Sequence, residues 1–271
     1  MKRLVAISIL MLLAFPSYGS SQTVFNGLLT NPNPGGCNTC ASVIAPGGDA
    51  LAARNGFFSF LSSNVAVENF AGLPINQATP VLDFGFAGSV SVPGAFVRND
   101  AWYQSNGFPA GVNGYGYFPT SGSNYLLATA SGTSAIELQF SQSVAAFGFY
   151  GIDIGDVGGT LLFRAYLGAN LVTSQVVHQS AVPAGTFVSG LNGSIRFFGL
   201  AFATNVFDRV ELLLDGAAGS LADGFLFDEM VVADARDVNL DVVPEPSTIV
   251  LLATGLAGVG LAARRRRRTT V

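Results

Sequence analysis

The sequence predicts an all-β protein, a single antiparallel β-sandwich of the jelly-roll type. Its composition is the first reason, because 33 Gly and 22 Phe stand against one Lys and one His in 271 residues, which disfavours a helical protein. Short apolar or alternating runs separated by Gly-rich turns are the second. The third is length, since the roughly 220 residues between the two terminal apolar segments suffice for one large core.

Seven runs have the clearest strand pattern. They are residues 136–140, 144–154, 160–167, 171–178, 195–202, 206–214 and 224–233. In the sixth run, Val210 and Leu212 share one face, whereas Arg209 and Glu211 share the other, as a half-buried strand requires. Asn192-Gly193 has the composition of a type I′ hairpin turn. We therefore place the sandwich domain at 65–233.

An N-terminal region of loop and short helix is expected over 20–64. Residues 20–48 are rich in Pro, Gly and Asn, which is typical of a loop. Residues 49–62 are expected to form the helix, with Asp49 as its N-cap. At the other end of the sandwich, residues 234–242 are expected to be a linker.

The N-terminus has the pattern of a secretory signal peptide over 1–19. Lys2 and Arg3 precede an apolar run over 4–15, and small residues follow Pro16 at the expected cleavage site. This pattern predicts that the chain crosses the inner membrane.

The C-terminus has the pattern of a short transmembrane helix with a stop-transfer signal. Residues 248–263 are 16 consecutive uncharged residues, about 24 Å long as a helix. The stop-transfer residues are Arg264, Arg265, Arg266, Arg267 and Arg268. Such a cluster remains in the cytoplasm, so residues 20–243 are expected on the far side of the membrane, held there by a transient anchor.

A proline-rich motif precedes this helix. Its residues are Val243, Pro244, Glu245, Pro246 and Ser247. The two prolines disfavour helix at the residues before them, so the motif is expected to be extended just outside the membrane.

The motif, the apolar helix and the Arg cluster, in this order over 243–268, resemble the PEP-CTERM sorting signal. The resemblance implies a Gram-negative protein that an exosortase cleaves near Pro-Glu-Pro and transfers to the cell surface or extracellular matrix. It also implies a biofilm or exopolysaccharide context. Similar tails are also catalogued as an ice-binding protein C-terminal domain, a label that follows from the tail and is no evidence of ice binding.

The charge of the body argues against nucleic acid as a partner. Residues 20–243 contain 6 basic and 16 acidic side chains, a net charge of −10, which repels phosphate backbones. The expected partners are the exosortase, the inner membrane during export, and exopolysaccharide.

Two features have an ordinary structural interpretation. Cys37 and Cys40 are expected to form a small-loop disulfide in an oxidising periplasm, because the βαβ context of a thioredoxin-like redox site is missing. His178 is expected to be a solvated residue at a strand end, since it has no second His for a metal site.

Three acids are candidate calcium ligands: Glu68, Asp223 and Asp228. Glu68 is expected in the first strand; if the first strand pairs with the last one, Glu68 approaches Asp228, and carboxylates supply the hard oxygen ligands that calcium prefers. Solvated acids in turns and at edges are the favoured interpretation, and a structural calcium is the alternative. No other cofactor is expected.

A secreted hydrolase using Asp153, Asp156 or Asp228 would need two facing carboxylates. The sequence does not reveal such a pair, so we predict no enzymatic activity.

Aromatic residues gather between positions 98 and 118, namely Trp102, Tyr103, Tyr115 and Tyr117 among Asn and Gly. A packed meander is the favoured interpretation. Sugars are bound by the same combination of aromatic platforms and polar loop groups. The sequence therefore predicts an exported non-enzymatic surface or matrix protein, with a calcium-stabilised carbohydrate-binding module as the alternative.

Overall fold

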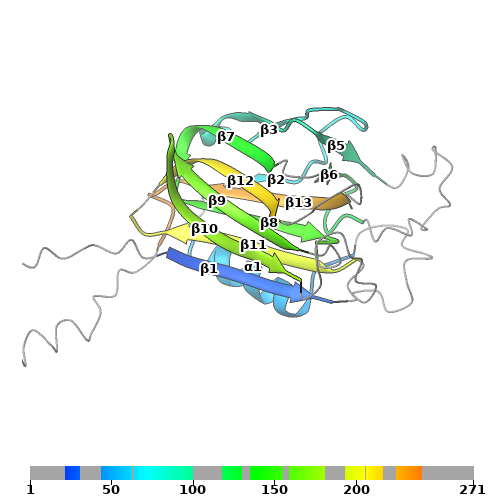
Figure 1. The fold of residues 1–271 in the computed structure, drawn as a ribbon, viewed down its shortest axis with the longest axis horizontal. Helices are drawn as coiled ribbons and strands as arrows, with labels where there is room; N and C mark the ends of the chain where they lie inside the picture. The colour runs from blue at the N-terminus through cyan, green and yellow to red at the C-terminus, as the bar shows by residue number, and fades with distance from the viewer. Residues whose placement is uncertain are drawn as a thin grey trace, which may run out of the picture.

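The computed structural model describes residues 22–30, 44–62, 64–99, 118–129, 135–154, 159–180, 193–204, 206–215 and 224–239. These residues form a seven-stranded and a four-stranded antiparallel sheet packed face to face, a further two-stranded sheet, and one helix on the outer face of the largest sheet (Figure 1). The prediction of a mostly β, antiparallel architecture with a short helix is confirmed. The jelly-roll connectivity stays a prediction.

The elements, in chain order, are β1 (Gln22–Leu29), α1 (Gly48–Ser59), β2 (Ala66–Glu68), β3 (Val81–Asp83), η1 (Gly85–Ala87), β4 (Ser89–Ser91), β5 (Ala95–Arg98), β6 (Tyr125–Thr129), β7 (Ala135–Val144), β8 (Ala146–Ile152), β9 (Thr160–Leu167), β10 (Asn170–Gln179), β11 (Ile195–Phe202), β12 (Phe207–Asp215) and β13 (Gly224–Ala233). The large sheet has the order β1-β11-β8-β13-β6-β5, and β2 also pairs with β13. The second sheet has the order β10-β9-β12-β7, and β3 pairs with β4. All seven predicted strands are present.

Phenylalanine fills the space between the sheets, which explains its abundance. Phe149 on β8 lies with its ring centroid 5.9 Å from Phe198 on β11 and 5.1 Å from Phe227 on β13. Phe163 reaches from the second sheet to Phe198 at 5.2 Å and stacks on Phe147 at 5.9 Å. We call this side of the large sheet the inner face. Tilted and edge-to-face aromatic pairs of this kind add about 0.5–1.5 kcal/mol each beyond their buried area.

The helix packs against glycines on the opposite side of the sheet, which we call the helix face. Gly148 and Gly199 are directly opposite each other on β8 and β11. A Cβ at either position would lie only 3.0 Å or 2.7 Å from the ring of Phe57 on α1. Phe57 is fully buried there. The two glycines therefore make the hollow that holds the helix.

The N-terminal region differs from the prediction. Residues 22–29 are not a loop, because β1 pairs along its whole length with β11, from Gln22 opposite Phe202 to Leu29 opposite Ile195. Sheet pairing outweighs the weak strand pattern of this segment. The N-cap of α1 is Gly47, without a side-chain cap, and Asp49 lies in the first turn. The sandwich thus begins at Gln22 and not at residue 65.

The sandwich has two distinct ends. At one of them, which we call the exit end, lie Ala145 between β7 and β8, Gly168 between β9 and β10, Thr204 and Val206 after β11, and residues 234–239 after β13. The register supports this arrangement, because Ala146 is opposite both Ala201 and Ala233. The last described residues of the chain therefore lie at this end. The predicted linker over 234–242 is folded against the sandwich as far as residue 239.

Candidate functional site

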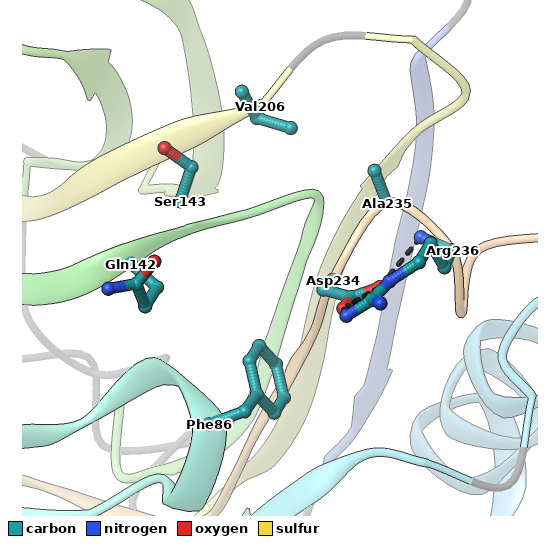
Figure 2. Close-up of a pocket in the computed structure, with 7 residues that line it drawn as sticks. All are labelled: Phe86, Gln142, Ser143, Val206, Asp234, Ala235 and Arg236. Atoms are coloured by element: carbon teal, nitrogen blue, oxygen red, sulfur yellow. Dashed lines mark hydrogen bonds and ion pairs between the residues drawn. The ribbon is translucent and has the colours of Figure 1, made fainter.

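An open pocket of about 470 Å³ lies at the exit end (Figure 2). It is lined by Phe86, Gln142, Ser143, Val206, Asp234, Ala235 and Arg236. Four separate segments build it: η1, the end of β7, the residue before β12 and the turn after β13. Its volume falls within the roughly 300–1,000 Å³ typical of small-molecule sites.

One wall of the pocket is a local ion pair. The Asp234 carboxylate accepts hydrogen bonds from the backbone N–H of Arg236 at 2.6 Å and from its guanidinium Nη2 at 2.6 Å. These bonds from Arg236 lower the pKa of Asp234, so the carboxylate is charged at neutral pH. Figure 2 shows the two side chains side by side along this wall. Since the charges compensate, the wall offers donors and acceptors without net charge.

The facing wall combines an aromatic ring with two polar groups. Phe86 points its half-buried ring into the pocket, and Gln142 and Ser143 are exposed beside it (Figure 2). Ser141 donates to the carbonyl of Ala87 at 3.0 Å, which holds η1 against β7. A ring that can stack, next to amide, hydroxyl and paired charged groups, suits a neutral polyhydroxylated ligand.

A second open pocket of about 410 Å³ lies on the other side of Val206. Its other lining residues are Leu167, Asn170, Leu171, Val172 and Thr204. Leu167 and Leu171 are 41% and 54% exposed. The exit end therefore offers two adjacent hollows, a polar one and a more apolar one. No pattern in the sequence links these distant residues, so sequence reasoning missed both pockets.

Asp228 is fully buried on the helix face. Its carboxylate accepts the backbone N–H groups of Thr120 at 2.7 Å and Ser121 at 2.8 Å, and the Thr120 hydroxyl at 2.8 Å. Burial raises the pKa of Asp228 to about 6, although these hydrogen bonds oppose the shift. The carboxylate thus ties the segment before β6 to the sheet, which is a structural role.

A β-bulge places Glu229 on the same face as Asp228. The register with β8 slips between Asp228 and Val231, and Glu229 has a φ of +53°. Its carboxylate pairs with Arg54 on α1, whose Nε lies 2.6 Å from Oε1. Tyr150, opposite Asp228, is buried beside this pair, and burial raises its pKa. Together these groups join the helix to the sheet.

The candidate calcium ligands do not all come together. Glu68 is opposite Met230, so β2 does pair with the last strand as expected. However, Glu68 accepts the backbone N–H groups of Phe70 at 2.7 Å and Asp83 at 3.3 Å, whereas Asp228 binds residues 120 and 121. Asp223 lies outside the described residues. Within the described part of the chain, no group of three His, Cys, Asp or Glu side chains is arranged to hold a metal ion.

His178 is buried and not solvated, which corrects the prediction. It faces Arg196, whose Nη2 lies 3.2 Å from its Nδ1, and Asn26 accepts a 2.6 Å hydrogen bond from the same guanidinium. Burial, together with the Arg196 charge, lowers the pKa of His178 to about 4. The sequence could not show this, because the burial comes from packing of β10 against the β1–β11 edge.

The other candidate residues divide into two groups. Asp153 is buried and accepts the backbone N–H of Gly193 at 2.7 Å, which is a structural role at the end of β8. Outside the described residues lie Asp156, Cys37, Cys40, Trp102, Tyr103, Tyr115 and Tyr117, as do the signal peptide, residues 243–247 and the Arg cluster. Among the helices that the structure describes, none is long and apolar enough to cross a membrane.

The comparison with protein families identifies the C-terminal segment. Residues 242–267 are a PEP-CTERM protein-sorting motif. This motif implies an exported protein that is sorted by an exosortase. It begins three residues after Asn239, where the described part of the exit end stops.

No curated protein matches the chain. Several solved structures are distantly similar to it. One is an adhesin domain of Lys-gingipain, 13% identical, which covers 64% of this chain and 99% of its own with a TM-score of 0.36. A second adhesin domain of Lys-gingipain, from Porphyromonas gingivalis, is 10% identical over 64% and 99%, with a TM-score of 0.33. A mutant family 29 carbohydrate-binding module complexed with mannohexaose is 9% identical over 65% and 96%, with a TM-score of 0.31. These similarities are too weak to transfer a ligand.

Proposed function

We propose that this protein is a non-enzymatic component of the cell surface or extracellular matrix, in a biofilm or exopolysaccharide context. An exosortase cuts it near residues 244–246 and transfers the sandwich out of the inner membrane. The sorting motif at 242–267, directly after the exit end of a folded β domain, carries this proposal. The structural roles of Asp153 and Asp228 support a non-enzymatic body, because backbone N–H groups donate to both carboxylates.

The decisive experiment is mass spectrometry of the mature C-terminus in cells with and without the exosortase. We expect a new C-terminus near residues 244–246 in the first case and an intact tail in the inner membrane in the second. Glu245→Ala should also leave the tail intact. The matched control is Glu137→Ala, which removes a carboxylate that is exposed on β7 and remote from the motif in sequence. An intact tail on the protein at the surface of wild-type cells would contradict the proposal.

A second candidate function is saccharide binding by the sandwich. The pocket of Figure 2 favours it, because a ring and uncharged or charge-compensated polar groups meet there. The aromatics at 102, 103, 115 and 117 are a separate proposed surface for the same ligand class, with calcium as a proposed stabiliser. We expect Phe86→Ala to weaken retention in gels that contain the organism's exopolysaccharide, and the exposed Val67→Ala to serve as the control. If only Trp102→Ala weakens it, the aromatic segment is the site. Unretarded wild-type protein would exclude both surfaces.

A further inference from the structure

The chain is fastened to the sandwich immediately before the sorting motif. We call this contact, between residues 60–62 and 64 on one side and residues 237–239 on the other, the exit clamp. Leu61 and Val238 form an antiparallel bridge. On either side of it, the N–H of Ser62 donates to the carbonyl of Asp237 at 2.8 Å, and the N–H of Asn239 donates to the carbonyl of Phe60 at 2.7 Å.

Asp237 adds two side-chain bonds to the exit clamp. Its carboxylate accepts the hydroxyl of Ser62 at 2.5 Å and the amide of Asn64 at 3.3 Å. Asp237 is itself buried, although it lies beyond the last strand. Leu61 and Val238 also pack against the apolar cluster under α1. The segment after β13 is therefore a fixed part of the domain.

Few residues separate the exit clamp from the motif. Only residues 240–243 separate Asn239 from Pro244. Four residues span at most about 14 Å when fully extended. A domain of about 200 residues has a radius of gyration of about 16 Å, so the sandwich is broader than this chain is long. An enzyme that grips an extended peptide on both sides of Pro-Glu-Pro would collide with the exit end.

We infer that the exit clamp controls processing: it must open before the exosortase can grip the sorting motif. Opening releases residues 237–239, so that seven residues instead of four separate the attached part of the domain from Pro244. Such an opening is local, because the bonds of the exit clamp lie outside the main sheets. This inference rests on the proposed exosortase cleavage and adds a step that precedes it.

The test locks the exit clamp with a disulfide. Bridge partners in an antiparallel pair have Cα atoms roughly 4.5–5.5 Å apart, which suits a disulfide. We therefore propose the full-length chain with Leu61→Cys and Val238→Cys, exported into the oxidising periplasm. Processing is followed as the fraction of cleaved tails over time, and mass spectrometry confirms the cross-link. We expect cleavage to slow at least about ten-fold, because the locked segment cannot detach.

One treatment and two further variants distinguish locking from misfolding. Addition of a reductant to isolated membranes should restore cleavage of the locked protein. Inserting six Gly and Ser residues after Asn239 should restore it without reduction, since the longer chain reaches the enzyme while the clamp stays closed. Leu61→Cys alone is the matched control: it cannot form the cross-link, so it should be processed no more slowly than the wild type.

The outcomes distinguish this inference from the proposed function. Cross-linked protein that is cut at the wild-type rate would overturn the inference alone, and so would an insertion that fails to restore cleavage. Asp237→Ala should speed cleavage several-fold by weakening the closed state. A wild-type tail that is never cut would overturn the proposed function and this inference together.

Discussion

The two faces of the large sheet are buried by different means. The inner face is covered by phenylalanine, with Phe149 and Phe198 as typical members. The helix face carries Asp228, which is bound by residues 120 and 121, together with Tyr150 and with Glu229, which is bound to α1. Apolar packing needs only the right volume, whereas each buried polar group needs a partner in one place. The inner face should therefore dominate the free energy of unfolding, and the helix face should determine how α1 is positioned.

The largest expected effect is on the inner face. Phe149→Ala should lower the free energy of unfolding by about 3–5 kcal/mol, because it removes a fully buried ring and leaves a cavity. Chemical denaturation of the residues 20–239 fragment measures this, provided that the fragment unfolds in one transition. Val67→Ala, on the exposed side of β2, is the control and should change stability by less than about 0.5 kcal/mol. A loss below about 1 kcal/mol for Phe149→Ala would mean that the core collapses to fill the cavity.

The second prediction concerns the pH dependence of stability. It compares two buried titratable groups, Asp228 and His178, whose effects have opposite signs. The pKa of Asp228 is raised to about 6 in the folded protein, so its carboxyl favours folding when protonated. Stability from this group falls as pH rises from about 4 to 6, by up to about 3 kcal/mol. The pKa of His178 is lowered to about 4, so stability from this group falls by about 3 kcal/mol as pH drops from 6.5 to 4. In the wild type the two slopes nearly cancel.

Single substitutions should reveal how each group makes stability depend on pH. Asp228→Asn leaves His178 unopposed, so stability should rise steeply between pH 4 and 6. His178→Gln leaves Asp228 unopposed, so stability should fall over the same range. Urea midpoints measured at several pH values check both. Parallel curves for the wild type and the two variants would show that neither group titrates as its burial requires.

The third prediction tests the hollow under the helix. Gly199→Ala should destabilise the fold by about 1–3 kcal/mol, because the new methyl group would meet the Phe57 ring at 2.7 Å. Phe57→Leu in the same chain should recover part of this loss by removing the edge of the ring. Gly72→Ala is the matched control, since nothing lies within 4 Å of its Cβ position. Additive effects in the double-mutant cycle would indicate that Phe57 does not occupy this hollow.

This contrast also explains what the sequence could predict. Alternation of Phe and Val with smaller or polar residues identified seven of the thirteen described strands, because it reports directly on the inner face, whereas β1 was missed. The bulge at Glu229, the glycine pair and the burial of His178 depend on which segments meet, and no local pattern encodes that. The polar pocket could not be predicted for the same reason, since Phe86, Gln142 and Asp234 come from distant segments of the sequence. The sorting motif was predictable because all of its parts are contiguous.

The smallest expected effect separates the two roles of Glu229 on the helix face. Its φ of +53° is costly for any residue with a Cβ, by about 1 kcal/mol, whereas its ion pair with Arg54 is only partly exposed and worth about as much. Glu229→Gly removes both the strain and the pair, so its stability should stay within about 0.5 kcal/mol of the wild type. Glu229→Ala removes the pair but keeps the strain, and should cost about 1 kcal/mol. The glycine variant would then be more stable than the alanine variant, although glycine is usually the less stable of the two inside a β-strand. Thermal unfolding of the two variants side by side measures the difference. If alanine is the more stable, the bulge does not hold residue 229 in the left-handed region, and the geometry that joins α1 to the sheet must be different.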